Sequence, residues 1–206
     1  MITVSTDGSC LRNPGGAIGW AWANHDGTHD SGGHPSGTNQ IAELMAVLEA
    51  VRSHPGDEPL TIQADSQYAI KCASEWVHGW RRKGWRTASG GPVQNLALIQ
   101  GIADAIAARP GGVAFVWVRG HRGDEFNERA DELAGIAARG VRDGSAGDDV
   151  GRAAAVASVG AAAGSRPAVA SDEGAATGSA PQALPGAAPG AAPRGSVPVE
   201  ELDVLF

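Results

Sequence analysis

Cysteine and long apolar runs are both scarce in this chain of 206 residues. Its 2 cysteines, Cys10 and Cys72, stand far apart in the sequence. This excludes a disulfide framework and a cysteine-based zinc site, and it is typical of a protein in a reducing cytoplasm. No apolar run approaches the roughly 20 residues that a membrane-spanning helix requires. We therefore expect a cytoplasmic protein that has no membrane partner.

Aromatic residues are nearly absent from the last third of the chain. All 6 Trp and the single Tyr precede position 127, and Phe206 is the only aromatic residue after it. Residues 141–206 are dominated by Ala, Gly, Pro and Ser. Such a composition cannot bury enough apolar surface to offset the entropy lost on ordering. We predict a folded domain at residues 1–140 and a disordered tail at 141–206 that ends in a short apolar motif.

An excess of positive charge is also lacking, since the formal net charge is -7. A nucleic-acid-binding protein of this charge must gather its basic residues locally. One stretch does so, residues 75–87, which we call the basic segment. Cations interleaved with aromatic rings suit a nucleic-acid backbone. The alternative is that Trp76 and Trp80, four residues apart on a helix, pack on the core. The segment contains Trp76, Trp80, Arg81, Arg82, Lys83, Trp85 and Arg86.

The periodicity of apolar residues predicts alternating strands and helices. Strands are expected at residues 2–6, 17–23, 60–64 and 113–118, the first two as an antiparallel pair. Helices are expected from residue 39 to a stop at 54–56, from residue 66 onward, at 93–108, and at 127–139 with Gly140 as a left-handed cap. This order predicts an α/β fold in which the later strands run parallel to the first.

Four carboxylates and a histidine stand in settings that indicate phosphoryl chemistry. Asp7 and Asp65 directly follow predicted strands, and strand ends are where open α/β sheets place ligands. Asp131 lies four residues after Asn127, on the same face of the last predicted helix. A carboxylate cluster is costly unless cations neutralise it, and two Mg²⁺ ions on a phosphate commonly do so. Taken singly, an Asp after a strand is more often a cap or turn residue, and Glu43 would ordinarily be a solvated helix charge.

Four motifs occur together and in order. They are TDGSCLRNPG at 6–15, TNQIAELM at 38–45, ADSQY at 64–68, and a fourth at 118–134 that contains GH and NERADELA. In this order they resemble bacterial ribonuclease HI from residue 1 to about 140. The resemblance implies a ribonuclease-H-like α/β fold, with a five-stranded mixed sheet flanked by helices and a catalytic domain at 1–140.

The resemblance also implies an active site. It makes Asp7, Glu43, Asp65 and Asp131 the ligands of two Mg²⁺ ions, for which Mn²⁺ can substitute. These ions would catalyse hydrolysis of the RNA strand of RNA·DNA hybrids, leaving 5′-phosphate and 3′-hydroxyl ends. His121 corresponds to a histidine that assists proton transfer or product release. Asn127 would position the last carboxylate or the water.

Substrate contacts follow from the same resemblance. Asn13, Asn39 and Gln67 match residues that contact the minor groove of the hybrid, where the RNA displays its 2′-hydroxyls. Thr38 and Asn95 match a pocket for a phosphate of the DNA strand. The basic segment resembles a substrate-binding protrusion, with contacts expected from Trp80, Arg81, Arg82, Lys83, Trp85 and Arg86.

The last residues form an apolar motif after the predicted tail. The sequence ELDVLF at 201–206 resembles peptides that bind bacterial sliding clamps, with Glu in place of the usual Gln. Leu202, Leu205 and Phe206 would be its anchors. The other interpretations are a tail without a partner and the remnant of a protease tag site, which the same residues also resemble.

Two other functions stay open from sequence. One is a catalytically silent module that binds RNA·DNA hybrids, and the other is a different ribonuclease-H-like nuclease, such as a resolvase or integrase. The presence of all four carboxylates favours an enzyme, and the basic segment together with the ADSQY motif favours the hybrid-specific branch. We expect a monomer that acts on RNA primers and R-loops.

Overall fold

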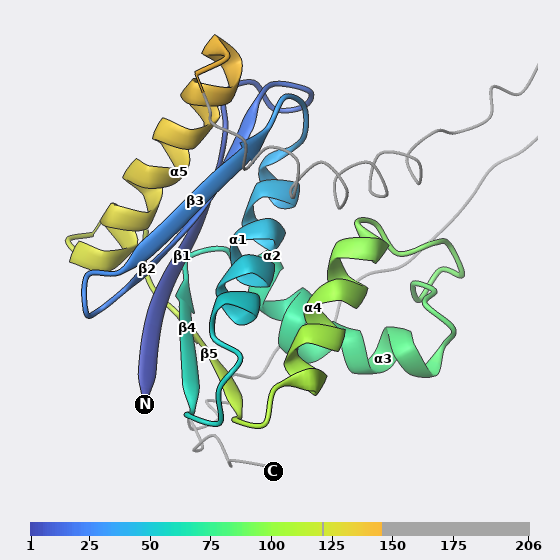
Figure 1. Ribbon diagram of the computed structural model, residues 1–206. Coiled ribbons are helices and arrows are strands. Elements are labelled where there is room, and N and C mark those ends of the chain that lie inside the picture. Colours follow the sequence, from blue (N-terminus) through green and yellow to red (C-terminus); the bar gives the residue numbers. More distant parts are fainter. Residues whose placement is uncertain (121, 146–206) are drawn as a thin grey trace, which may run out of the picture. The chain divides into compact units, whose positions relative to one another are not determined.

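The structure is a computed structural model that describes residues 1–120 and 122–145 (Figure 1). The strands are β1 (Ile2–Cys10), β2 (Ile18–Asn24), β3 (His29–His34), β4 (Leu60–Ala64) and β5 (Val113–Trp117). The helices are α1 (Asn39–Ser53), α2 (Gln67–Ile70), the π-helical segment η1 (Lys71–Trp76), α3 (Val77–Arg82), α4 (Leu96–Ala108) and α5 (Glu125–Asp143). None of the helices in these ranges is both long and apolar enough to cross a membrane.

The five strands form one mixed sheet in the order β3-β2-β1-β4-β5. The pairs β1–β2 and β2–β3 are antiparallel, whereas β4 lies parallel to β1 and β5 lies parallel to β4. Parallel strands need crossover connections, and α1 supplies the first of them, between β3 and β4. The α/β fold, the five-stranded mixed sheet and the parallel later strands are confirmed.

Helices cover the sheet on both faces, because successive residues of a strand point to opposite sides. Ile18, Trp20 and Trp22 of β2 belong to the main core, which they share with α1 and α4. Ala21 points the other way and packs with Leu133 of α5. Figure 1 shows α5 on one side of β1, β2 and β3, with α1 on the other side. The sheet therefore carries one helix on its second face, and this helix bears Asp131.

Strand β3 has no counterpart among the strands expected from periodicity. Its sequence, HDSGGH, contains no apolar residue, and it lies at the edge of the sheet. An edge strand pairs on one side only and can be polar without leaving the core exposed. Hydrogen bonding to β2 forms this strand, and no apolar pattern marks it.

Three helix boundaries differ from the sequence expectation, and one of them is the start of α5, which lies at Glu125, two residues earlier than expected. The prediction that α5 ends at Gly140 is wrong, because α5 continues to Asp143 and Gly144 takes the left-handed cap with φ 69°. Helix α4 begins at Leu96, three residues later than expected, after Asn95 adopts a left-handed conformation with φ 54°. By contrast, α1 ends at Ser53, where the His-Pro-Gly stop signal predicted its end.

Candidate active site

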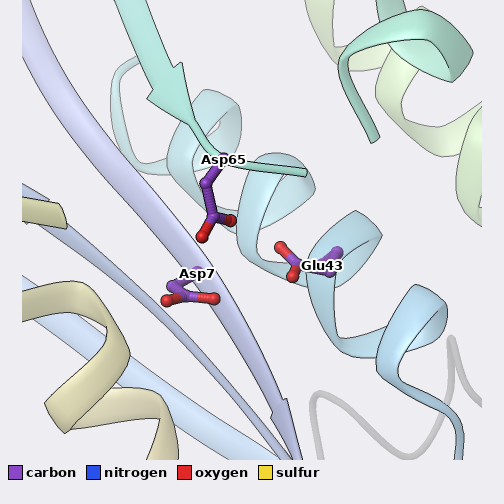
Figure 2. A group of neighbouring side chains, drawn as sticks. All are labelled: Asp7, Glu43 and Asp65. Atoms are coloured by element: carbon purple, nitrogen blue, oxygen red, sulfur yellow. The ribbon is translucent and has the colours of Figure 1, made fainter. Parts of the chain in front are cut away.

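Three of the predicted carboxylates come together beside the central strands. Asp7, Glu43 and Asp65 each offer an oxygen, and these oxygens lie within 4.8 Å of one another. Figure 2 shows the three side chains, from β1, α1 and the end of β4, directed toward a common space. Asp7 and Glu43 are buried, and Asp65 is half-buried. An acidic cluster removed from water to this degree is a candidate metal site.

The sheet register brings Asp7 and Asp65 together. Thr6 of β1 pairs with Ala64 of β4 in parallel register, so the next residues, Asp7 and Asp65, are neighbours. Strand β4 ends at Ala64, which leaves Asp65 at its carboxyl end, while β1 continues to Cys10. The prediction that both residues lie at strand ends is therefore correct for Asp65, and Asp7 lies inside a longer strand.

Gly8 explains how Glu43 reaches the cluster from a helix. A Cβ atom at position 8 would lie 2.3 Å from the backbone nitrogen of Glu43 and 2.4 Å from the carbonyl carbon of Ala42. Only glycine permits this approach, so α1 rests directly on β1 at the turn that carries Glu43. The side chain of Glu43 is 6% exposed as a result, unlike the solvated charge that its place off the apolar stripe suggested.

The electrostatics of the cluster are those of like charges removed from water. Burial, followed by the charges of Asp65 and Asp131, raises the pKa of Asp7 from 3.8 to about 7, although the Gly8 amide donates to its Oδ1 at 2.6 Å. Burial, followed by the charges of Asp7, Asp65 and Asp131, raises the pKa of Glu43 well above 4.5. Such a cluster is most stable with protons or cations to balance it.

Asp131 joins this cluster electrostatically from α5. Its charge contributes to the raised pKa of both Asp7 and Glu43, which places it within electrostatic range of them. One turn earlier, Asn127 is 2% exposed, and its backbone N–H donates to the N-capping carboxylate of Asp124 at 3.0 Å. The Asn127 Oδ1 atom is buried without a hydrogen-bond partner among the described residues. Asn127 thus faces the interior, which suits positioning rather than direct contact with substrate.

His121 lies outside the described residues. Its neighbours Gly120 and Arg122 are described, with Arg122 exposed at the surface. The chain between β5 and α5 passes the carboxylate cluster just before His121, because Gly120 lies against Asp65.

The residues predicted to contact the minor groove lie on the surface, and two of them are linked to Glu43. Asn13, Asn39 and Gln67 are all exposed. The backbone N–H of Asn39 donates to Asn13 Oδ1 at 3.4 Å, and Asn39 Nδ2 donates to Glu43 Oε1 at 3.5 Å. A chain of polar contacts therefore connects the surface residues Asn13 and Asn39 to a buried carboxylate of the cluster.

The two residues predicted for the phosphate pocket have structural partners. Thr38 caps α1, where its hydroxyl accepts from the backbone N–H of Ile41 at 3.2 Å. Asn95 precedes α4, and its Nδ2 donates to the Tyr68 hydroxyl at 3.0 Å. Both are half-buried, so each keeps some surface for a ligand.

The basic segment forms the end of η1, helix α3 and the turn after it. Arg81, Arg82, Lys83 and Arg86 are exposed. Arg81 forms a loose ion pair with Asp104 at 3.5 Å, and Arg86 donates to the Gly90 carbonyl at 3.0 Å. Trp80 and Trp85 pack partly on the core. Trp76 is 40% exposed and meets Tyr68 and Trp80 edge to face. The tryptophans thus support a surface on which the cations are displayed.

Sequence reasoning missed three residues that shape the site, namely Gly8, Trp117 and Gly120. The Trp117 indole N–H donates to the backbone carbonyl of Asp65 at 3.0 Å. Gly8 and Gly120 have no side chain and so permit a close approach, by the backbone of α1 at Gly8 and by the Asp65 carboxylate at Gly120. The sequence did offer a signal for the two glycines, since Gly8 follows Asp7 in the first motif and Gly120 precedes His121 in the fourth.

The strand order and the carboxylates around β1 and the end of β4 define the ribonuclease-H-like class of α/β folds. Within that class, the RNase H family model matches residues 1–139. A ribonuclease H of Anaeromyxobacter dehalogenans strain 2CP-C is 47% identical over 146 residues, which cover 66% of this chain and 79% of that protein. A ribonuclease H of Paracidovorax citrulli strain AAC00-1 is 42% identical over 137 residues, which cover 65% of this chain and 91% of that protein. The chain belongs to the ribonuclease H family of hydrolases.

Solved structures agree with this fold. The crystal structure of LC9-RNase H1, a type 1 RNase H with the type 2 active-site motif, has a TM-score of 0.56 at 28% identity and covers 74% of this chain and 83% of that one. A foamy viral protease-reverse transcriptase in complex with dsDNA has a TM-score of 0.58 at 23% identity, over 66% of this chain and 93% of that one. The second likeness supports the fold alone.

Proposed function

We propose that this protein hydrolyses the RNA strand of RNA·DNA hybrids by two-metal-ion catalysis. Asp7, Glu43, Asp65 and Asp131 would hold two Mg²⁺ ions, with Mn²⁺ as a substitute. The observation that supports this most directly is the meeting of three carboxylate oxygens within 4.8 Å in a mostly buried setting. Family membership supports the choice of substrate.

The residues present fit divalent ions of this kind. Mg²⁺ prefers carboxylate oxygens, and the cluster offers only such ligands. With its pKa raised to about 7, Asp7 remains partly protonated at neutral pH when no cation balances the cluster. Bound divalent ions supply Lewis-acid stabilisation of the charge that develops on the phosphoryl oxygens.

The side chains around the cluster have supporting roles in this proposal. Asn39 donates to Glu43 and so restrains the orientation of its carboxylate. Asn127, buried one turn before Asp131, would position that carboxylate or the water. His121 would take up or release a proton near the leaving group, because imidazole titrates near neutral pH. The products would carry 5′-phosphate and 3′-hydroxyl ends.

Selection of the hybrid would come from the polar surface beside the cluster. Asn13, Asn39 and Gln67 are exposed amide side chains, which can donate to and accept from the 2′-hydroxyls of an RNA strand. Thr38 and Asn95 would bind a phosphate of the DNA strand. The cations of the basic segment would contact more of the DNA backbone, because they are exposed on one stretch of the surface.

Digestion of end-labelled duplexes tests this function against its alternatives. With Mg²⁺, we expect cleavage of an RNA·DNA hybrid only in its RNA strand, and no cleavage of double-stranded DNA or RNA. Asp65→Asn should bind the hybrid but not cut it, whereas Glu132→Gln, at a side chain 58% exposed on α5, should cut normally. Binding without cleavage by the native chain would indicate a silent module, and cleavage of double-stranded DNA would indicate another nuclease of this fold.

In the cell, such an activity would remove RNA primers and R-loops in the cytoplasm, with the protein acting as a monomer. A defect of this kind is measurable as retained hybrid in chromosomal DNA. These roles rest on the substrate alone, since any RNA paired with DNA presents the same 2′-hydroxyls.

The terminal motif supports a second proposal, binding to a sliding clamp. Leu202, Leu205 and Phe206 lie outside the described residues, so the proposal rests on their sequence. We expect a labelled peptide of residues 197–206 to bind a purified bacterial clamp with a Kd below about 10 µM, measured by fluorescence polarisation. Binding should be lost when Leu205 and Phe206 are changed to Ala. A chain ending at residue 145, beyond α5, should cleave free hybrids normally. Absence of peptide binding would leave the motif without a partner.

A further inference from the structure

The carboxyl end of β5 and the chain just after it lie against Asp65 at two separate points. The first is on the backbone, where the Trp117 indole N–H donates to the Asp65 carbonyl at 3.0 Å. The parallel ladder ends just before it, with the Val118 N–H donating to the Ala64 carbonyl at 3.0 Å. Asp65 itself lies between β4 and the Ser66 cap of α2. The indole therefore adds a hydrogen bond to a carbonyl just beyond the end of the ladder.

The second point of contact is the Asp65 carboxylate. A Cβ atom at Gly120 would lie 2.2 Å from Asp65 Oδ2 and 3.2 Å from its Cγ. The φ angle of Gly120 is outside the left-handed region, so a positive φ is not the reason for glycine at this position. Glycine is needed at this position for space, and the space that it leaves is occupied by the carboxylate.

From these contacts we propose that Trp117 and Gly120 are positioning residues for Asp65. The indole fixes the backbone of Asp65, and the bare backbone of Gly120 sets where its carboxylate lies relative to Asp7 and Glu43. This inference rests on the proposed metal site, because position matters only if Asp65 is a ligand. Neither residue needs to touch the substrate. The two act through Asp65, as residues around a metal ligand do when they fix its orientation.

Gly120→Ala is the sharpest test of this proposal. The atom that a new methyl group would meet is the end of a side chain, so the carboxylate can turn aside while the fold is kept. We expect Mn²⁺ binding to the hybrid-free protein, followed by electron paramagnetic resonance, to weaken by about 10- to 100-fold. Thermal unfolding in the absence of metal should change little. Trp117→Phe keeps an aromatic ring, although a smaller one, and removes the N–H donor, and it should weaken Mn²⁺ binding to a smaller extent.

Gly112→Ala is the matched control, since a Cβ there meets no atom within 4 Å. It should bind Mn²⁺ as the native protein does. A double variant gives a readout that a general structural role would not produce. In an Asp65→Asn background the charged ligand is already lost, so adding Gly120→Ala should weaken Mn²⁺ binding far less than it does in the native background.

The outcomes separate this inference from the proposed function. If Asp65→Asn binds Mn²⁺ as tightly as the native chain, the proposed metal site itself is wrong. If Asp65→Asn weakens binding but Gly120→Ala does not, only the positioning role is overturned. An equal additional weakening from Gly120→Ala in both backgrounds would also overturn it, because the effect would then not pass through Asp65.

Discussion

Asp7→Asn is expected to abolish cleavage while making the metal-free protein more stable at neutral pH and above. Cleavage should fall by at least about 10³-fold, because a metal ion contributes several kcal/mol of transition-state stabilisation and each decade of rate corresponds to about 1.36 kcal/mol. The fold should be kept, since Asn retains an oxygen to accept from the Gly8 amide. Initial rates on a labelled hybrid with Mg²⁺ measure the first effect.

The stability gain has a sign fixed by the direction of the pKa change. Folding raises the pKa of Asp7 from 3.8 to about 7, so the folded state favours the protonated form. Ionised Asp7 therefore destabilises the protein increasingly as the pH rises from about 4 to 7, and fully above that. The raised pKa of Asp7 lowers the free energy of unfolding by at most about 4 kcal/mol, because part of the effect is shared with the neighbouring carboxylates.

Thermal unfolding without metal at two pH values tests this sign. Asp7→Asn should raise the Tm at pH 8 by several degrees, as expected for a gain of a few kcal/mol. At pH 4 the two proteins should unfold together. Asp57→Asn, at an exposed loop residue, makes the same charge change and should leave Tm and cleavage as they are. Equal destabilisation by Asp7→Asn at both pH values would show that Asp7 has a structural role and that the cluster is not strained.

The sequence contained enough to predict the carboxylates that lie next to the parallel strands. Asp65 follows a five-residue β-rich run, and parallel pairing of β1 with β4 then places Asp7 beside it. Strand periodicity and the direction of the crossover are sufficient for this prediction. The general architecture was predictable for the same reason, since apolar patterns mark β1, β2, β4, β5 and α1.

Glu43 could not be located in this way. It lies off the apolar stripe of α1, and helical periodicity alone makes it a solvated charge. Its burial depends on the approach of α1 to Gly8, a contact between residues distant in sequence. The proposed role of Trp117 likewise depends on a hydrogen bond to the backbone carbonyl of Asp65. Every residue has such a carbonyl, so the sequence does not indicate this bond. Strand β3 could not be predicted from apolar periodicity, because it lies at the edge of the sheet and contains no apolar residue.

We propose that the basic segment gives this chain, whose net charge is -7, a local surface for binding a polyanion. Its four cations are displayed on α3 and the turn after it, and the partly buried Trp80 and Trp85 tie this turn to the core. Among the described residues, Arg82 and Lys83 make no ion pair, whereas Arg81 meets Asp104 and Arg86 meets a carbonyl. Arg82 and Lys83 are thus the cations most available to phosphates.

Changing Arg81, Arg82, Lys83 and Arg86 together to Gln should raise KM for the hybrid and largely keep kcat, because these residues are not among those proposed to hold the metal ions. Removing one phosphate contact should reduce the slope of log K against log salt by about 0.9 or somewhat less, so the four together would reduce it by about 3. If the native and quadruple-variant proteins bind equally at about 1 M salt, a slope change of this size makes the variant bind up to roughly 10³-fold more weakly at about 0.1 M salt. Steady-state kinetics at several salt concentrations measure both quantities.

A pair of double variants shows whether position or total charge is responsible. Arg82→Gln with Lys83→Gln should account for about half of the change in slope or more, since these two cations make no ion pair among the described residues. Arg129→Gln with Arg142→Gln removes the same charge from α5, where both side chains are exposed, and should leave KM and the slope nearly as they are. If both pairs lower the slope equally, binding of the hybrid depends only on the overall charge of the protein. If the quadruple variant keeps the native slope, the basic segment does not contact the backbone of the hybrid.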